Sequence, residues 1–200
     1  MPSWREALAE SIAEEARPRE KFGHQPRLYA LTQAIGQGSV YDDDVVFAAS
    51  YLHDLGVFFG HRPEDPITLA SWNNVTYAMT QAPEILLNLG FPEPKIPSVL
   101  EAIRTHQPRF VPSTLEATIL RDADILEQLG AIGILRTVCK VGRDTRFHTF
   151  TEAIASLRRA LDELPPLLTL SQSKLLAEPR VLTLRTFLEA TQSEAGSLLL

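Results

Sequence analysis

Residues 43–56 read DDVVFAASYLHDLG, and the interpretation of the whole chain starts from this stretch. Its apolar middle follows a run of aspartates, which is typical of a helix cap with acidic residues in the first turn. His53 and Asp54 end the run just before a glycine, where a helix can stop. We therefore predict a helix over 43–54 that turns both side chains into a cleft. The alternative is that His53 only stabilises the helix end while Asp54 is solvated.

Apolar residues elsewhere in the chain recur mostly at intervals of three and four, which is helical spacing. The 14 prolines separate the apolar stretches from one another. An all-α fold is expected, with strands only incidental. The predicted helices cover 3–17, 26–37, 43–54, 67–88, 97–106, 114–138, 150–163 and 172–194.

The length of 200 residues favours a single domain over 1–200, because a short terminal segment would hardly bury a core of its own. Within it we expect a compact helical bundle over about 20–138. A C-terminal helical pair over about 145–195 is expected to pack on this bundle. The polar stretch at 140–148 is the best candidate for a break between the two parts.

Composition excludes several classes of protein. A hydrophobic content of 44% with 22% charged residues indicates a folded chain, and the net charge of −6 argues against non-specific nucleic-acid binding. No apolar run is long enough to span a membrane, and the acidic N-terminus does not resemble a signal peptide. We expect a cytoplasmic protein. Cys139 is the only cysteine, so thiolate-cluster metal sites are excluded, and it is expected to be a buried thiol.

Histidines and carboxylates supply a candidate metal site. Two neutral imidazoles and two carboxylates are enough to hold one divalent cation with positions left open, and this mixture favours a transition metal over calcium. One carboxylate is ambiguous, because Asp122 and Asp124 point about 200° apart on a helix and the apolar stripe runs between them. Glu127 shares the face of Asp124 and is a candidate acceptor or base beside it.

Three segments carry a family resemblance. HQPRL at 24–28 is similar to an H-x-x-R-V opening, and HDLG at 53–56 is similar to an H-D-I-G element. DADILEQLGAIG at 122–133 contains an Ala-Asp-x-Leu setting. Their order resembles the H…HD…D signature of the HD-domain metal-dependent phosphohydrolases, in particular a bacterial HD-hydrolase subgroup. The resemblance covers approximately residues 20–190.

The resemblance implies a compact all-α HD domain in which distant helices direct four side chains at one metal ion. It selects Asp124 over Asp122, although the reverse assignment stays open, and it makes Asp122 a support residue. The implied metal ligands are His24, His53, Asp54 and Asp124.

The resemblance also implies roles around the metal. Asp54 is expected to orient or deprotonate the attacking water, and His106 to contact the phosphate or protonate the leaving group. Arg27, His61 and His106 are the expected substrate-binding residues. Arg27 is included because it shares a helical face with His24, and the alternative for it is an ion pair with a local carboxylate. His61 and His106 also resemble histidines that hold a second metal in some members, but His61 follows the HD pair more closely than in that pattern. Its loop is expected to be exposed.

The implied activity is hydrolysis of a phosphate ester or anhydride in a small phosphorylated compound, a nucleotide among the candidates, by metal-activated water. The metal would be Mn, Fe, Co, Ni or Zn, with Mg as an alternative. A homodimer stays open. One rival is an HD-type diiron oxygenase, which would need both extra histidines as ligands. The other is a non-catalytic HD-like module that binds a nucleotide or a protein, against which the complete ligand set argues.

Overall fold

The computed structural model describes residues 2–142 and 147–198, and these are mostly helical. Within them lie ten α-helices and four short 3-10 helices, while β-structure is limited to two isolated bridges. The all-α fold class is confirmed. None of the described helices is long and apolar enough to cross a bilayer.

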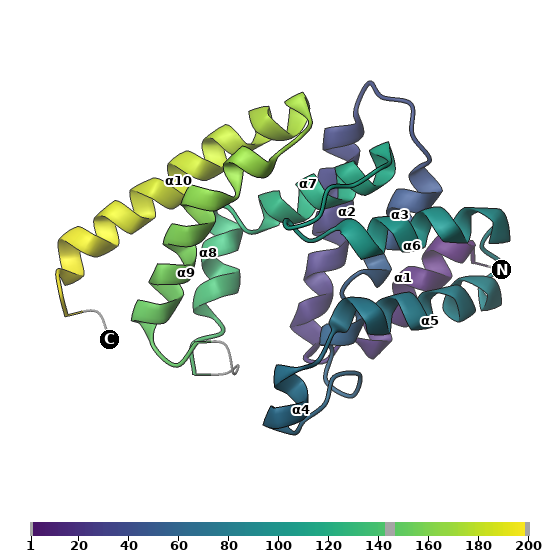
Figure 1. The fold of residues 1–200 in the computed structure, drawn as a ribbon, viewed down its shortest axis with the longest axis horizontal. Helices are drawn as coiled ribbons and strands as arrows, with labels where there is room; N and C mark the ends of the chain where they lie inside the picture. Colours follow the sequence, from purple (N-terminus) through teal and green to yellow (C-terminus); the bar gives the residue numbers. More distant parts are fainter. Residues whose placement is uncertain (1, 143–146, 199–200) are drawn as a thin grey trace. The chain divides into compact units, whose positions relative to one another are not determined.

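The chain divides into two compact units, Met1–Arg121 and Asp122–Leu200 (Figure 1). The division falls within helix α7 (Leu115–Glu127). The break expected at 140–148 lies inside the second unit instead, and residues 143–146 are outside the described part of the chain. The single domain expected for the whole chain stays a prediction.

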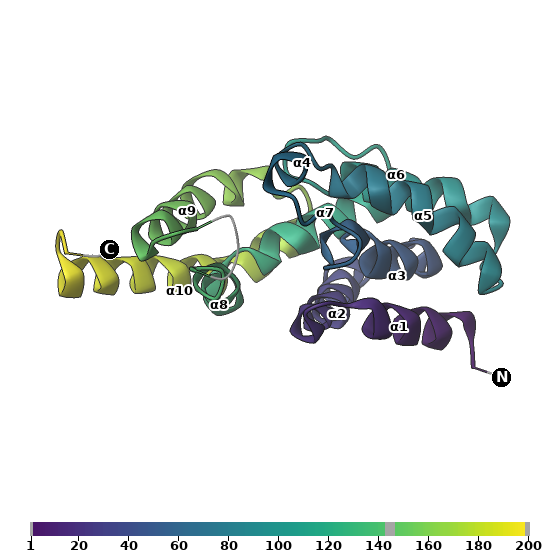
Figure 2. The same cartoon turned by 90° about the horizontal axis from the view of Figure 1, so that it is seen from below.

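Helix α3 (Asp43–Leu52) is at the centre of the first unit. All of its side chains from position 45 to position 52 are buried, because neighbouring helices surround it. In Figure 2, α1 lies on one side of α3 while α5 and α6 lie on the other. This arrangement explains why the sequence of α3 is apolar on every face. The surrounding helices are α1 (Trp4–Glu15), α2 (His24–Gly36), α5 (Asn74–Asn88) and α6 (Ile96–Thr105).

The helix expected over 67–88 is wrong as a single element. It is divided into α4 (Pro66–Ala70) and α5. The division follows from Asn73, whose side-chain oxygen accepts two backbone N–H groups of the first turn of α5, each at 3.1 Å. Asparagine in this position begins a new helix because it satisfies donors that have no partner inside the helix.

The helix expected over 114–138 is also two helices, α7 and α8 (Gly130–Val138). Gly130 has a φ of +68°, which glycine adopts without strain. A Cβ atom at Gly133 would collide with the backbone carbonyl of Gln128. The chain can therefore end one helix and start the next only because small residues occupy both places.

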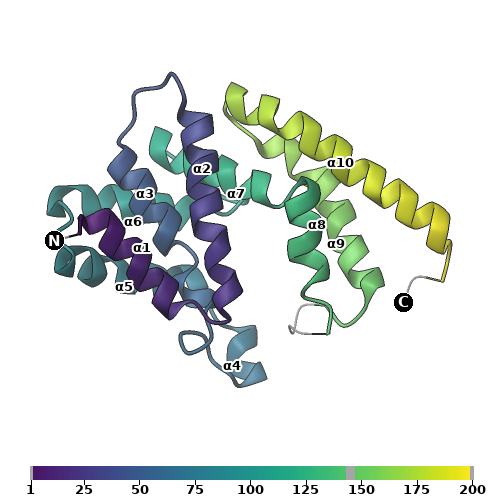
Figure 3. The ribbon, with the colours of Figure 1, turned by 180° about the vertical axis from the view of Figure 1, so that it is seen from behind.

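The second unit contains α8, α9 (Phe150–Glu163) and α10 (Ser171–Ala195), which pack against one another (Figure 3). The expected C-terminal pair is therefore part of a group of three helices. Cys139 is exposed rather than buried, because it is the cap residue that follows α8.

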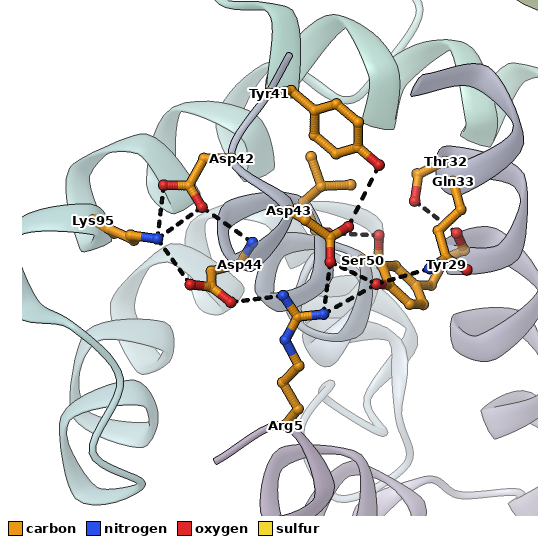
Figure 4. A network of polar contacts seen from close by, with 11 residues as sticks. Arg5, Tyr29, Thr32, Gln33, Tyr41, Asp42, Asp43, Asp44, Ser50 and Lys95 are labelled. Atoms are coloured by element: carbon orange, nitrogen blue, oxygen red, sulfur yellow. Dashed lines mark hydrogen bonds and ion pairs between the residues drawn. The ribbon is translucent and has the colours of Figure 1, made fainter. Parts of the chain in front are cut away.

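Charged side chains join the N-terminal end of α3 to its surroundings (Figure 4). Asp42 accepts the backbone N–H of Asp44 at 3.1 Å, which confirms the predicted cap. Arg5 from α1 contacts Asp43 at 2.7 Å and Asp44 at 2.6 Å, and Lys95 contacts Asp42 and Asp44 at 2.8 Å. Hydrogen bonds from Lys95 and Arg5 hold the pKa of Asp44 below its ordinary value.

Candidate metal centre

The opposite end of α3 carries the His-Asp pair. The helix ends at Leu52, and the backbone N–H of His53 still donates to the Ala49 carbonyl at 3.0 Å. Asp54 has left the helical conformation, with φ −104° and ψ 15°. The predicted end of the helix is confirmed, although the helix stops two residues earlier than expected. Both polar side chains therefore follow a buried helix.

Gly56 has a different role from the expected helix stop. It lies in the 3-10 helix η2 (Leu55–Val57), and a Cβ atom there would lie 2.6 Å from the backbone oxygen of Asn74. Any larger side chain would push this turn away from the start of α5. The glycine therefore permits the close approach of two backbones directly after Asp54.

His24 meets this corner from another element, as the first residue of α2. Its Nε2 atom lies 3.2 Å from Nε2 of His53, and both side chains are buried. The Oδ2 atom of Asp54 lies 3.7 Å from the first nitrogen and 3.6 Å from the second. The structure thus brings together three of the four predicted ligands.

The hydrogen bonds of His53 determine which nitrogen faces the other ligands. Its Nδ1 atom lies 3.0 Å from the carbonyl oxygen of Ser50. Because a carbonyl can only accept, Nδ1 carries the hydrogen, and the neutral ring leaves the lone pair on Nε2. Histidines that bind metals are oriented in this way by a backbone acceptor on the other nitrogen.

The spacing of the three atoms fits one cation. Two ligand atoms about 2.1 Å from a metal lie about 3.0–3.4 Å apart at angles of about 90–109°, and about 3.6–3.7 Å apart at angles near 120°. The distances between the His24 nitrogen, the His53 nitrogen and the Asp54 oxygen are 3.2 to 3.7 Å. Imidazole nitrogen with carboxylate oxygen is a donor set for transition metals such as Mn, Fe, Co, Ni and Zn. These residues therefore fit the divalent metal that the sequence predicts.

His106 lies on the same corner. It follows the last residue of α6, is buried, and its ring centre is 4.9 Å from that of His53. Its Nδ1 atom lies 2.6 Å from the carbonyl oxygen of Ile103, so its Nε2 atom is the one directed away from the backbone. Ligand atoms of His53, Asp54 and His106 lie within 4.8 Å of one another.

Arg27 is an exposed residue in the first turn of α2. A Cβ atom at Gly23 would be 3.0 Å from Nη1 of Arg27, so the guanidinium lies against the residue that precedes His24. A planar cation beside the metal ligands is suited to bind phosphoryl oxygens.

The loop at 60–66 is exposed at both ends, as expected, but His61 itself is partly buried. Its Nδ1 atom lies 2.9 Å from the carbonyl oxygen of Leu55, and its Nε2 atom lies 3.4 Å from the carboxylate of Glu15. The ring also contacts Tyr77, at 5.3 Å between centres. Both nitrogens of His61 therefore face protein atoms rather than the metal ligands.

Asp122 has a clear structural task in the second unit. It is fully buried, and its carboxylate accepts the backbone N–H groups of Thr169 at 3.0 Å and Leu170 at 2.9 Å. These groups lie just before α10, so Asp122 holds the segment that leads into that helix. The helical wheel could not separate the two aspartates, whereas the structure commits this one to backbone donors.

The other two acidic candidates also lie in the second unit, at the end of α7. Asp124 accepts a hydrogen bond from the side chain of Gln128 at 3.3 Å. Glu127 is buried and contacts Arg136 at 3.1 Å. The part of Asp124 as a ligand, and of Glu127 as its support, stays a prediction.

Sequence reasoning gave no role to Lys21 or Trp72. The Lys21 ammonium donates to the Val57 carbonyl at 2.9 Å, and the Trp72 indole N–H donates to the Gly56 carbonyl at 2.9 Å. The only signal for Lys21 is its place shortly before His24. Nothing in the sequence pointed to Trp72, because its acceptor is a distant backbone carbonyl.

Several solved structures resemble the chain over nearly its full length. The Bacillus subtilis protein YpgQ, in complex with ADP, aligns with a TM-score of 0.73 at 19% identity and covers 98% of this chain and 96% of its own. A Bacillus thuringiensis protein described as an HD-superfamily hydrolase aligns with a TM-score of 0.69 at 19% identity, covering 96% and 97%. A protein from an uncultured Thermotogales bacterium, described as a predicted HD superfamily hydrolase, gives 0.64 at 20% identity, covering 94% and 91%. At such identities the likeness shows the fold.

No curated protein matches the sequence. The model of the HD domain matches residues 7–129, which is more than half of the chain. This match includes every predicted metal ligand and both histidines considered for the substrate. The chain therefore belongs to the HD domain family.

Proposed function

We propose that this protein is a metal-dependent phosphohydrolase that cleaves a phosphate ester or anhydride in a small phosphorylated compound. One observation carries the proposal: His24 Nε2, His53 Nε2 and Asp54 Oδ2 lie 3.2 to 3.7 Å apart, the spacing of ligands around one cation. Membership of the HD family, whose similar structures include proteins described as hydrolases, supports the reaction class.

Asp124 is proposed as the fourth ligand. The family match runs to residue 129 and so contains it. The other nearby candidate, Asp122, is already bound to Thr169 and Leu170. A carboxylate that accepts two backbone N–H groups would leave both donors unsatisfied if it turned toward a metal.

The chemistry divides between the cation and the protein. A bound divalent cation would polarise a phosphoryl oxygen and make a water molecule more acidic. Asp54 orients that water or accepts its proton. Arg27 binds phosphoryl oxygens, and His106 presents Nε2 toward the phosphate or the leaving group, because Nδ1 is bound to the Ile103 carbonyl.

Nucleotides are the first substrate class to test. YpgQ, which shares this fold, has been crystallised with ADP. For the present chain we propose only the class of compound, nucleotides, and not ADP itself. Sugar phosphates and a simple aryl phosphate complete the set, because they separate recognition of the phosphate from recognition of the base.

The experiment uses protein freed of metal with a chelator and resupplied with Mn²⁺, Co²⁺, Ni²⁺, Zn²⁺ or Mg²⁺. Phosphate or pyrophosphate release is measured with nucleoside mono-, di- and triphosphates, sugar phosphates and p-nitrophenyl phosphate. The proposal predicts turnover only with metal, and loss of turnover and weaker metal binding in Asp54→Ala with helix content retained. Turnover without metal, or undiminished turnover in Asp54→Ala, would contradict it.

The same preparations test the rival functions. Iron bound together with oxygen-dependent turnover would indicate a diiron oxygenase, and tight nucleotide binding without turnover would indicate a binding module. Asp124→Asn and Asp122→Asn form a matched pair. We expect the first to weaken metal binding and the second to lower stability; the opposite pattern would exchange the two assignments.

A further inference from the structure

The turn that follows Asp54 is held from outside by three side chains. Each of its carbonyl groups, at Leu55, Gly56 and Val57, accepts a hydrogen bond from a residue elsewhere in the first unit. All three donor–acceptor distances are 2.9 Å. The donors, in the order of these carbonyls, are His61 Nδ1, Trp72 Nε1 and Lys21 Nζ.

The turn needs such support because its own hydrogen bonds are few. The N–H of Val57 donates to the Asp54 carbonyl at 3.0 Å, and the N–H of Phe58 donates to the Leu55 carbonyl at 3.4 Å. A single 3-10 turn has poorer hydrogen-bond geometry than an α-helix. Without further contacts, the backbone that carries Asp54 would have several accessible conformations.

We propose that Lys21, Trp72 and His61 form a carbonyl clamp that fixes η2 and thereby positions the Asp54 carboxylate for metal binding. The inference rests on the proposed function, because a clamp that positions Asp54 matters only if Asp54 binds a catalytic metal. None of the three is proposed to touch the reacting atoms. They act through the backbone, as positioning residues.

Each donor is itself held in place. The Glu15 carboxylate lies 3.4 Å from Nε2 of His61, which turns Nδ1 toward Leu55. The Trp72 ring lies 5.4 Å from the Tyr77 ring, and the Lys21 ammonium lies 5.2 Å from the centre of the Phe59 ring. Donors that are already ordered lose little entropy when they bond, so the clamp is pre-organised.

Lys21 also connects two ligand segments. It lies in the 3-10 helix η1 (Arg19–Gly23), which leads directly into His24. Its bond to Val57 therefore ties the segment before His24 to the turn after Asp54. The distance between these two ligands thus depends on a lysine that contributes nothing to the donor set.

The clamp is tested with variants that remove one donor each and keep most of the bulk: Lys21→Met, Trp72→Phe and His61→Leu. His61→Asn is the rescue variant, because its amide can again donate toward Leu55. Two readouts are independent of turnover: hydrogen exchange of the Val57 and Phe58 amides in metal-free protein, and Mn²⁺ affinity by calorimetric titration. Steady-state kinetics are then measured on the best substrate.

We expect faster exchange at both amides and Mn²⁺ binding weakened about 10- to 100-fold, the usual effect of losing a residue that orients a ligand. The decrease in turnover should be in kcat, with KM nearly unchanged. His61→Asn should recover part of each effect. Lys95→Met is the control, because it removes an equally well-bonded lysine from the other end of α3 and should leave both readouts at wild-type values.

Folded donor variants with wild-type exchange at both amides and wild-type Mn²⁺ affinity would overturn the clamp. Equal changes in Lys95→Met would also overturn it, because the effect would then be general destabilisation. Wild-type protein that binds Mn²⁺ but hydrolyses no phosphate would contradict the proposed function instead. The clamp would then be tested by hydrogen exchange at Val57 and Phe58 and by Mn²⁺ affinity alone.

Discussion

The two ends of α3 use similar residues in opposite ways. At the N-terminal end, aspartates contact Arg5 and Lys95 at 2.6 to 2.8 Å, the distance of direct ion pairs. At the C-terminal end, two imidazole nitrogens and one carboxylate oxygen stand 3.2 to 3.7 Å from one another. The first arrangement is complete as it stands. The second has the spacing of three ligand atoms around one metal ion.

This difference separates stability from function along one helix. Opposite charges in contact stabilise the connection of α1 and η3 (Glu93–Lys95) to α3. The group at the other end has the spacing of metal ligands, and its two histidines are buried. Substitutions at the N-terminal end should therefore change the free energy of unfolding. Substitutions at the C-terminal end should change metal affinity and turnover.

The largest effect is expected from His24→Ala. Removal of one ligand should lower metal-dependent turnover by on the order of a thousandfold, or about 4 kcal/mol in the activation free energy. Helix content by circular dichroism should be close to that of the wild type. Turnover within tenfold of wild type would place the metal elsewhere and end the contrast between the two ends.

The second largest effect is expected from Asp122→Ala, which extends the comparison to the second unit. The N–H groups of Thr169 and Leu170 would lose their acceptor, and the free energy of unfolding should fall by about 2–3 kcal/mol. Denaturant unfolding measures this change. Mn²⁺ affinity of the folded variant should equal that of the wild type; a large decrease in affinity would instead make Asp122 a ligand.

A smaller effect is expected from Lys95→Met. Its side chain is 33% exposed, so the ion pairs with Asp42 and Asp44 should contribute no more than about 1 kcal/mol. Denaturant unfolding should show this decrease while kcat and KM are unchanged. A decrease in kcat would mean that the paired end of α3 also serves the reaction.

The smallest effect concerns pH. Lys95 and Arg5 lower the pKa of Asp44 from its ordinary value of 3.8. A carboxylate with a lowered pKa in the folded state stabilises the protein above the unfolded pKa, and this contribution is lost as pH falls through the folded value. The difference in unfolding free energy between wild type and Lys95→Met should therefore have its largest value at pH 7 and a smaller value at about pH 3. A difference that grows on acidification would contradict the sign.

Both ends of α3 were accessible from the sequence because their signals are local. Three aspartates before an apolar run predict a capped, buried helix, and the His53–Asp54 pair at its end is part of a family signature. The position of Asp122 at the start of α10 could not be predicted, because Thr169 and Leu170 are distant in the sequence. The resemblance alone preferred Asp124.

The features that sequence reasoning missed depend on contacts between distant backbone and side-chain groups. The bonds of Lys21 and Trp72 to carbonyl oxygens have no sequence pattern, because every residue offers such an acceptor. The helix breaks at Asn73 and Gly130 had readable signals. The helical spacing of apolar residues continues through both positions. The prediction followed this spacing rather than the cap residues, and so each pair of helices was expected as one.

The central claim is tested most directly by anomalous X-ray diffraction from crystals of the protein soaked in Mn²⁺. We predict one strong peak within about 2.0–2.3 Å of His24 Nε2, His53 Nε2 and a carboxylate oxygen of Asp54. The same map would show whether Asp124 completes the set. Absence of a peak at saturating Mn²⁺, or a peak only at the aspartates beside Lys95, would contradict the account.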